Sequence, residues 1–222
     1  MKKYYLFFLL FYFKINLFAQ KVNAIHVSQV AKVRDKNFKI ILKSDGTLSI
    51  YNYKTNLIQR INQTSLYYGN AGFESLEFID FNGDNHKDLL IHYMTNVPDV
   101  CDLLLYNSKK QKFIIVSNFT SFPVPKIIRG NKLYYSYRRS GCADLDWNSD
   151  LFAIKNYKAV AIGNIFGKEC EGDGPNRIEI SRIKGTNKVL FKRLPISTIR
   201  KYKNDKWGFI KAFWTNNCDK FI

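Results

Sequence analysis

The stretch "DFNGDNHKD", residues 80–88, carries oxygen-bearing side chains at every second position. Three aspartates and one asparagine alternate there with other residues. Oxygen ligands in this spacing converge on one cation when a short loop wraps around it, and calcium takes about six to eight such oxygens. We therefore predict a Ca²⁺ site in this loop. Its predicted ligands are Asp80, Asn82, Asp84, His86 (through its backbone carbonyl) and Asp88.

The loop differs from an EF-hand at two positions. Its sixth residue is Asn85 where an EF-hand has glycine, although asparagine tolerates the left-handed conformation that the turn needs. Its twelfth residue is Ile91, so the bidentate glutamate of an EF-hand is missing. The flanking "SLEFI" and "LLIHY" have strand character, which predicts a calcium loop joining two strands. The alternative is an acidic turn without metal, since Asn-Gly and Asp-Asn favour turns in any case.

Two further acidic stretches lie closer to the C-terminus. The first, "CADLDWNSD", has oxygen side chains at alternate positions: Asp144, Asp146, Asn148 and Asp150. A second metal site there stays open, but no glycine lets the segment wrap around an ion, so a solvated turn leading into the strand "DLFAI" is favoured. The second stretch, "ECEGDGP", surrounds Cys170 with acidic residues and predicts a loop held by a disulfide.

Strands must position these loops, and the chain is rich in hairpin patterns. Five segments alternate apolar and polar residues around a turn: "NFKIILKSDGTLSIYNY", "LLLYNSKKQKFIIV", "KIIRGNKLYYSYRR", "DLFAIKNYKAVAIG" and "RIEISRIKGTNKVLF". Helical periodicity is confined to residues 56–61 and 197–203. We predict an all-β fold, a small β-propeller or a propeller-like stack of antiparallel hairpins, with a β-sandwich as the alternative. The number of blades stays open because no repeated motif is present.

The N-terminus has the order of a secretory signal peptide. Two lysines precede an apolar run, and Ala19 marks the predicted cleavage site. We therefore predict a signal peptide over 1–19 and a single all-β domain over 20–222, exported to the periplasm or the outside, with an uncleaved anchor as the alternative. Removal of residues 1–19 takes away three lysines and no acidic residue, so the net charge falls from +17 to +14.

All four cysteines lie after the predicted signal peptide. In an oxidising compartment an even number of cysteines predicts two disulfides, and none of them forms a CxxC pair that would indicate zinc. Three connectivities are possible. Proximity in the sequence favours Cys142 with Cys170, which leaves Cys101 with Cys218.

The calcium loop also resembles a known family. "DFNGDNHKDLLI" is similar to the FG-GAP or VCBS repeat of β-propellers, whose pattern it follows except for Asn85. Over residues 74–163 the order of loop and hairpins resembles a group of small bacterial periplasmic proteins with a calcium-binding, propeller-like fold. Some of those proteins inhibit lysozyme-like enzymes. The resemblance implies a structural Ca²⁺ ion and a binding function toward a cell-wall lytic enzyme.

Charge sets a condition on that function. Lysozymes are typically basic, so an inhibitor of net charge +14 needs a local acidic face to meet one. A disulfide between Cys142 and Cys170 would bring the two acidic stretches together and form such a face. This arrangement is an expectation for the structure to test.

Positive charge gathers in the C-terminal third. Residues 177–206 hold ten Lys and Arg against two acidic residues, and "KWGFIKAFW" follows directly. Outside the inner membrane such a tract favours an acidic glycan or lipid surface, which is the alternative function; nucleic acid is an unlikely partner for an exported protein. The simpler interpretation is that lysines cover a β surface while Trp207, Phe209, Phe213 and Trp214 fill the core.

Catalysis has no signature in this sequence. The chain contains three histidines, and His92 is expected on a strand as a packed or hydrogen-bonded residue. GxSxG, HExxH and glycine-rich phosphate loops are missing from the sequence. We therefore predict a binding protein rather than an enzyme, with no membrane-spanning segment after signal cleavage.

Overall fold

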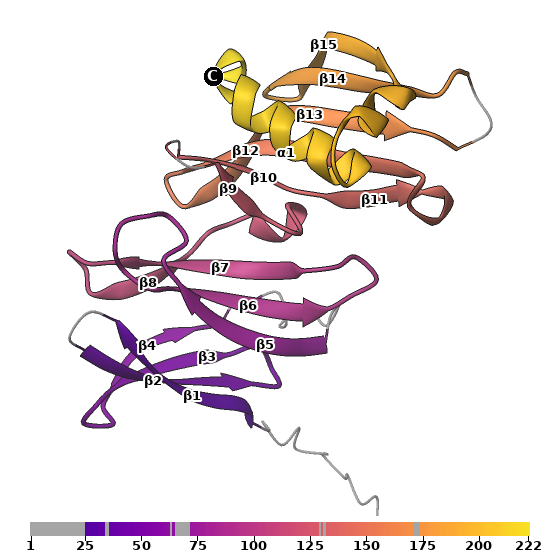
Figure 1. Cartoon of the computed structure of the whole chain (residues 1–222). Coiled ribbons are helices and arrows are strands. Elements are labelled where there is room, and N and C mark those ends of the chain that lie inside the picture. The colour runs from indigo at the N-terminus through magenta and orange to yellow at the C-terminus, as the bar shows by residue number, and fades with distance from the viewer. Residues whose placement is uncertain are drawn as a thin grey trace, which may run out of the picture.

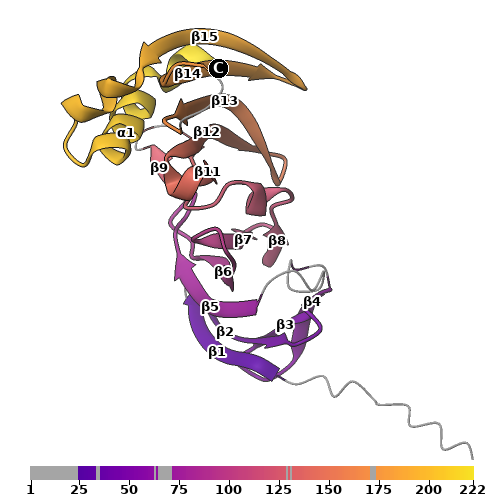
Figure 2. The same ribbon diagram turned by 90° about the vertical axis from the view of Figure 1, so that its right-hand side faces the viewer.

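The computed structural model describes residues 25–33, 36–62, 64, 72–128, 130, 132–170 and 174–222. The predicted signal peptide 1–19 lies outside these residues. In the described part, β-strands form three antiparallel sheets that follow the chain order (Figure 1). Figure 2 shows the sheets one above another along a curved line. The all-β prediction is confirmed, in its form of a propeller-like stack of antiparallel hairpins.

The first sheet is a four-stranded meander. Its strands are β1 (Ile25–Val33), β2 (Lys36–Lys43), β3 (Leu48–Asn52) and β4 (Leu57–Ile61). The hairpin predicted around Asp45-Gly46 is confirmed, with the Thr47 amide donating to the Asp45 carboxylate at 2.8 Å. The helix predicted over 56–61 is wrong. That segment is β4, because pairing with β3 satisfies its backbone groups.

The second sheet is also a four-stranded meander. It comprises β5 (Gly72–Ile79), β6 (Asp88–Met94), β7 (Val100–Asn107) and β8 (Lys112–Ile115). The strands predicted on either side of the calcium loop are thus confirmed as β5 and β6. Alternate residues of β6 point to opposite faces. Leu89, Ile91 and Tyr93 pack with β2 and β3 of the first sheet, whereas Leu90 faces the other way.

The third sheet has seven strands in the order β15-β14-β13-β12-β10-β9, with β11 paired to β12. Its strands are β9 (Lys126–Ile128), β10 (Leu133–Tyr135), β11 (Arg138–Gly141), β12 (Asp146–Lys155), β13 (Lys158–Lys168), β14 (Arg177–Lys184) and β15 (Asn187–Pro195). The short 3-10 helix η2 (Phe119–Ser121) precedes it. An aromatic cluster joins the second and third sheets: Phe81, Phe119, Phe122, Tyr134 and Phe152.

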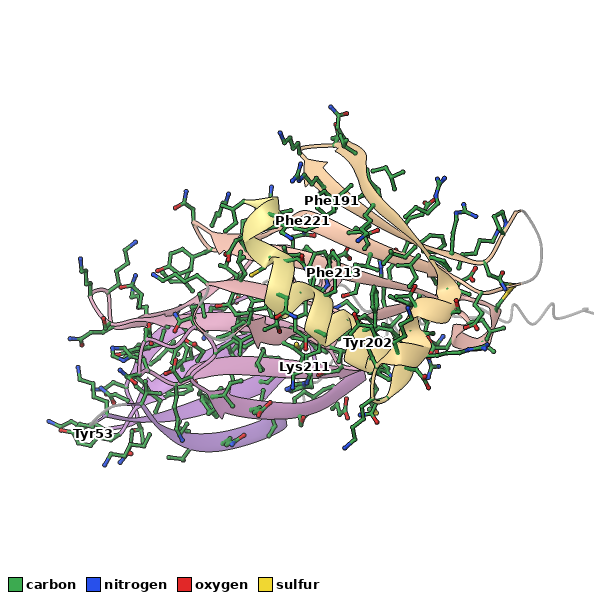
Figure 3. The ribbon with its side chains drawn as sticks, turned by 45° about the horizontal axis from the view of Figure 1, so that its top comes forward. Tyr53, Phe191, Tyr202, Lys211, Phe213 and Phe221 are labelled. Atoms are coloured by element: carbon green, nitrogen blue, oxygen red, sulfur yellow. A yellow bond between two sulfur atoms is a disulfide. The ribbon has the colours of Figure 1, made fainter. Side chains whose placement is uncertain are left out.

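The other face of the third sheet is covered by the helix α1 (Asp205–Asn217). The 3-10 helices are η3 (Cys142–Asp144), η4 (Ile196–Lys201) and η5 (Cys218–Phe221). Phe191 of β15, Phe213 and Phe221 are neighbours where the helix meets the sheet (Figure 3). The indole N–H of Trp214 donates to Ser149 Oγ at 2.9 Å. Within the described part, no helix is long and apolar enough to span a bilayer.

The C-terminal segment differs from the prediction in two respects. The helix predicted over 197–203 is the 3-10 helix η4, and the longer helix α1 was not predicted. Phe209 and Trp214 are buried as expected, but Phe213 is half-buried and Trp207 is 45% exposed. Trp207 lies on the solvent side of α1, because only one side of a helix can face the sheet.

Trp147 packs across the sheet on a glycine. It pairs in register with Gly167 of β13. A Cβ atom at Gly167 would lie 2.1 Å from the Trp147 ring, so only glycine leaves room for the buried indole. This contact fixes β12 against β13 beside the loop that carries Cys142.

The disulfide prediction is half right. Cys142 and Cys170 are bonded, with their Cα atoms 5.9 Å apart. The pairing of Cys101 with Cys218 is wrong, because neither of these buried residues is in a disulfide. Cys101 packs between the second and third sheets, whereas Cys218 packs under α1 on the opposite face of the third sheet. The third sheet therefore separates the two thiols.

Thiol titration tests this pairing. The unfolded, unreduced chain is expected to give two reactive thiols, those of Cys101 and Cys218, while the folded chain reacts slowly because each residue is only 1% exposed. Quantification with a chromogenic disulfide reagent, with and without denaturant, measures both values. If the unfolded chain gave no thiol, Cys101 and Cys218 would be disulfide-bonded and the pairing seen in the structure would be contradicted.

Candidate functional site

The loop between β5 and β6 folds around the carboxylate of Asp80. This carboxylate accepts the backbone N–H groups of Gly83 at 2.9 Å, Asp84 at 3.0 Å and Asn85 at 2.8 Å. Such bonds turn the chain sharply, and Gly83 and Asn85 take left-handed conformations with φ of 74° and 65°. The expectation that Asn85 replaces a left-handed glycine is confirmed.

The next two predicted ligands continue the same pattern. Asn82 Oδ1 accepts the Asp84 N–H at 3.1 Å, and Asp84 Oδ1 accepts the His86 N–H at 2.9 Å. The Asn82 amide also donates to Asp84 Oδ2 at 3.2 Å. The side chains of Asp80, Asn82 and Asp84 are therefore held by the loop's own amides, as in an ion-binding turn.

Asp88 has a different position, since it is fully buried at the start of β6. One of its oxygens accepts the Phe81 N–H at 3.0 Å and the other the Tyr106 N–H of β7 at 2.8 Å. Burial raises the pKa of the Asp88 carboxyl to about 6, although both of these hydrogen bonds oppose the shift. Asp88 thus fastens the loop to the second sheet.

Phe81 carries that attachment into the core. Its ring stacks on Tyr134 of β10, with centroids 4.9 Å apart, and meets Phe119 edge-on at 5.4 Å. The second residue of the loop therefore packs between the second and third sheets. The loop positions a core residue as well as the ligand oxygens.

His86 contributes a buried side chain as well as its backbone. The ring lies 5.8 Å from Tyr106, and Nδ1 lies 3.8 Å from Asp84 Oδ1. Within the described residues, this Nδ1 is buried without a hydrogen-bond partner. The prediction gave His86 only a carbonyl role, and the side chain adds an unsatisfied polar atom beside an acidic residue.

The donor chemistry of the loop fits calcium. Asp80, Asn82 and Asp84 offer oxygens only, and a surface cavity of about 460 Å³ reaches Asn82 and Asp84. Both oxygens of Asp88 already accept amide hydrogens, so its role in the structure is to anchor the loop. The carboxylate oxygens of Asp80, Asp84 and Asp88 do not all lie within 4.8 Å of one another. Two other groups of potential metal ligands in the described part do meet that distance. Calcium itself stays a prediction.

A second feature is the pair of disulfide-linked loops, residues 141–146 and 169–170. Cys142, Ala143 and Asp144 all take positive φ, at 47°, 49° and 79°. Burial alone would raise the pKa of Asp144. The hydrogen bond from Lys206, with Nζ and Oδ2 2.8 Å apart, opposes burial, and the pKa of Asp144 is lowered. The hydroxyl of Tyr137 also donates to Asp144. These contacts hold the first loop against α1.

The acidic face expected from these loops is smaller than predicted. Asp144 is neutralised by Lys206, and Asp146 Oδ1 accepts the N–H groups of Glu169 at 2.9 Å and Cys170 at 3.0 Å. Residues 171–173, with two of the acids of "ECEGDGP", lie outside the described residues. Among the described residues of these loops, Glu169 therefore remains as the acid whose carboxylate forms no hydrogen bond or ion pair.

The favoured interpretation of "CADLDWNSD" as a turn leading into a strand holds only for its first residues, Cys142–Asp144 of η3 and Leu145. Strand β12 already begins at Asp146, because pairing with β11 and β13 extends the sheet to that residue. Burial raises the pKa of Asp150, against the Asn164 amide that donates to it at 2.7 Å. Lys188 Nζ donates to Asn164 Oδ1 at 2.7 Å. A hydrogen bond from the neighbouring strand β13 and the nearby Arg138 thus balance the buried carboxylate of Asp150.

The basic tract divides into paired and unpaired cations. Arg177 and Arg193 both contact Glu179, at 2.8 and 2.9 Å. By contrast, three exposed cations at and after η4 form no ion pair with any described residue: Arg200, Lys201 and Lys203. These three cations form a positive patch just before α1, while the exposed Lys184, Lys188 and Lys192 of β14 and β15 also lack an ion pair with any described residue.

Sequence reasoning missed two features. Phe81 was treated as a spacer between ligands, although an aromatic residue inside an acidic loop is a signal of anchoring. His92 was expected to be hydrogen-bonded, which is confirmed, but its neighbours Asp99 and Cys101 were not connected with it. The signal in the sequence was that His92 and Cys101 lie on either side of a short turn and so could face each other across a hairpin.

Comparison with known proteins finds only distant structural similarity. No family model matches the chain, and no curated protein matches its sequence. A structure described as a Xanthomonas Type IV secretion system related protein is 13% identical with a TM-score of 0.49, covering 74% of this chain and 93% of that one. The Dos1 propeller is 9% identical with a TM-score of 0.32, and the match covers 71% of this chain and 55% of that one. These distant similarities carry no functional conclusion.

The pH dependence of stability tests the burial of Asp88. Its folded pKa of about 6 exceeds the ordinary 3.8, so the folded state holds the proton more tightly than the unfolded state. With a calcium chelator present, protonated Asp88 contributes its full stabilisation below pH 3.8. This contribution, about 3 kcal/mol, is lost as the pH rises through 6. Urea unfolding measures this change, and Asp88→Asn is expected to remove it. If the free energy of unfolding changed with pH in the same way in both proteins, the raised pKa of Asp88 would be contradicted.

Proposed function

We propose that this chain is an exported, calcium-stabilised binding protein that inhibits a lysozyme-like cell-wall lytic enzyme. It acts by occupying its partner rather than by catalysis, from the periplasm or the outside of the cell. The observation that carries this proposal is the pair of disulfide-linked loops, whose exposed Leu145 lies beside Trp207 of α1 on a rigid support.

The rigidity of these loops favours binding. A disulfide, the half-buried, ion-paired Lys206 and backbone bonds to Asp146 hold residues 141–146 in one conformation. A segment ordered before association loses less conformational entropy when its partner arrives. The strained left-handed residues at 142–144 are typical of a loop whose shape matters to its function.

The exposed side chains supply the contact. Leu145 is 47% exposed and Trp207 is 45% exposed. The Trp207 ring lies 3.9 Å from Tyr137, and Lys206 Nζ lies 5.4 and 5.8 Å from the centroids of these two rings. A cavity of about 330 Å³ beside them reaches Leu145 and Glu169. Aromatic residues beside a pocket are enriched among the residues that dominate protein interfaces.

Charge then limits the rate rather than the affinity of binding. Because Asp144 is paired, Glu169 and Asp205 are the other described acids that line this cavity, and the chain as a whole is basic. Like charge slows the encounter with a basic enzyme, whereas apolar contacts determine how long the complex lasts. The proposal therefore expects slow association and tight packing at Leu145 and Trp207.

Calcium has a structural place in this proposal. Asp80, Asn82 and Asp84 would hold the ion, and its positive charge would offset the acidic groups of the loop. The loop also carries Phe81 and Asp88, so a fixed loop keeps the second and third sheets in contact. The calcium loop would support the binding surface without forming it.

A lysis assay tests the inhibition. The protein, in calcium, is expected to slow the lysis of bacterial cell walls by at least one lysozyme-type enzyme. Leu145→Ala with Trp207→Ala should weaken inhibition about 10-fold or more, since each anchor is worth roughly 1–2 kcal/mol. The matched control is Val189→Ala with Leu190→Ala, which removes equally exposed apolar groups from β15. Unchanged lysis by several such enzymes at stoichiometric protein would contradict the proposal.

The alternative is binding to an acidic glycan or lipid surface through Arg200, Lys201 and Lys203. Their exposure without ion pairs favours it. It predicts retention on an anionic polysaccharide or anionic vesicles that falls steeply with salt and is lost when the three are changed to glutamine. The control changes three exposed lysines elsewhere: Lys32, Lys39 and Lys109. Equal loss in both variants would indicate net charge alone, and this function would then be rejected.

A further inference from the structure

Three potential metal ligands converge at one end of the second sheet. His92 of β6 and Cys101 of β7 are direct partners across the hairpin, and Asp99 immediately precedes β7. His92 Nδ1 lies 2.9 Å from Asp99 Oδ1. One ligand atom from each of the three residues lies within 4.8 Å of the others.

The hairpin explains this convergence. Side chains of directly opposed residues stand on the same face of a sheet, so His92 and Cys101 are neighbours by register. Asp99 has a left-handed φ of 52°, and its carbonyl accepts the Val124 N–H at 3.1 Å. The segment that leads to the third sheet therefore fixes Asp99 over the same face. The cluster is built by backbone pairing and does not depend on a loose loop.

A fourth residue orients the histidine. Glu77 Oε2 lies 3.2 Å from His92 Nε2. A carboxylate on one ring nitrogen directs the other nitrogen toward a metal, which is the usual arrangement behind a metal-bound histidine. Here that second nitrogen, Nδ1, is the one that faces Asp99.

Charge around the cluster favours a cation. The carboxylates of Asp99, Asp102 and Glu77 act on the Cys101 thiol, and Lys126 is the opposing cation. His92 lies between the carboxylates of Asp99 and Glu77, with one of them at each ring nitrogen. A metal ion on Nδ1 would place positive charge among these acidic groups.

We propose that His92, Asp99 and Cys101 form a site for a divalent transition-metal ion of the zinc class, with Glu77 as the orienting carboxylate. Nitrogen, sulfur and oxygen together select zinc-like ions, whereas calcium takes oxygen ligands. Zinc bonds of about 2.0–2.3 Å set ligand atoms roughly 3.3–3.8 Å apart. The His92–Asp99 contact needs to open by only a few tenths of an ångström to match.

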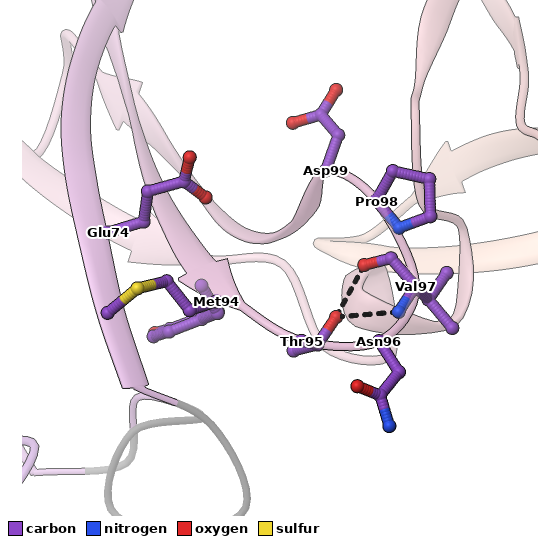
Figure 4. Close-up of a pocket in the computed structure, with 8 residues that line it drawn as sticks. Glu74, Met94, Thr95, Asn96, Val97, Pro98 and Asp99 are labelled. Atoms are coloured by element: carbon purple, nitrogen blue, oxygen red, sulfur yellow. Dashed lines mark hydrogen bonds between the residues drawn. The ribbon is translucent and has the colours of Figure 1, made fainter.

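The site has a route to solvent. A cavity of about 550 Å³ is lined by Glu74, Met94 and the segment from Thr95 to Asp99. Figure 4 shows Glu74 and Asp99 on opposite sides of this opening, with the Thr95 hydroxyl bonded to Val97. The Cys101 sulfur lies on the buried side. Asp99 is the proposed ligand that lines this cavity, and a site with three protein ligands leaves a fourth coordination position for water or a small ligand.

Metal titration tests the site. Calorimetry with Zn²⁺, on protein with its disulfide intact and excess Ca²⁺ present, is expected to show one zinc per chain. Co²⁺ should then produce a thiolate-to-cobalt charge-transfer absorption, which a site made only of oxygen ligands cannot give. Competition of Zn²⁺ with Co²⁺ for this absorption links the two measurements.

Matched variants assign the ligands. Asp99→Asn and Cys101→Ser should each lose the zinc site, while Glu77→Gln should weaken it roughly 10- to 100-fold. The control Cys218→Ser changes the other buried thiol and should bind zinc normally. Asp99 is partly exposed, so Asp99→Asn keeps the test valid if Cys101→Ser fails to fold.

The calcium loop supplies the opposing outcome. A variant with Asp80→Ala and Asp84→Ala should retain zinc and the cobalt absorption, because the proposal does not depend on that loop. Zinc binding that is lost in this variant, that persists in Asp99→Asn and Cys101→Ser, or that is not detected at micromolar concentrations would overturn the proposal.

Discussion

The arrangement of the sheets depends on one buried carboxylate. Asp88 accepts two backbone N–H groups, from Phe81 in the loop before it and from Tyr106 in the neighbouring strand. Removal of one partner from a buried hydrogen-bonded group costs about 1–3 kcal/mol, and more when the group is charged. Because these bonds fix the backbone of Phe81, they place its ring against Tyr134 of the third sheet. The loop therefore connects ligand chemistry on the surface to packing in the core.

The stack explains why the middle of the molecule is so apolar. The second sheet has the first sheet on one face and the third sheet on the other, so Leu89, Leu90 and Ile91 are all buried. Burial of each such side chain contributes about 1.5–3 kcal/mol, but only while both neighbouring sheets are in place. The third sheet in turn carries α1 and the disulfide-linked loops. Contact between sheets therefore supports the proposed binding surface.

Local signals in the sequence predicted local structure well. Asp45-Gly46 and the left-handed Asn85 gave correct turns, since the conformational preferences of these residues operate over a few positions. The strands beside the calcium loop were predicted for the same reason. The segment 56–61 failed because pairing with β3 outweighs its helical spacing. Helix α1 was missed because its cations and aromatic residues were interpreted as a basic surface tract and not as part of a helix.

Contacts between distant segments were beyond such signals. Cys101 and Cys218 were paired by elimination, and only the position of the third sheet between them shows why they stay apart. The cluster of His92, Asp99 and Cys101 depends on strand register, which no spacing along the chain displays. Phe81 likewise acquires its role from Tyr134, more than fifty residues later. Side chains that meet across sheets had to be seen in the structure.

The most direct measurement is thermal unfolding followed by tryptophan fluorescence, with calcium and with a chelator. All three tryptophans belong to the third sheet or α1, whereas the calcium loop lies in the second sheet. We expect calcium to raise the midpoint reported by these tryptophans, and to have no effect on a variant with Asp80→Ala and Asp84→Ala. Identical midpoints with calcium and with chelator in the unmodified protein would contradict the claim that this loop, once it holds its ion, keeps the sheets together.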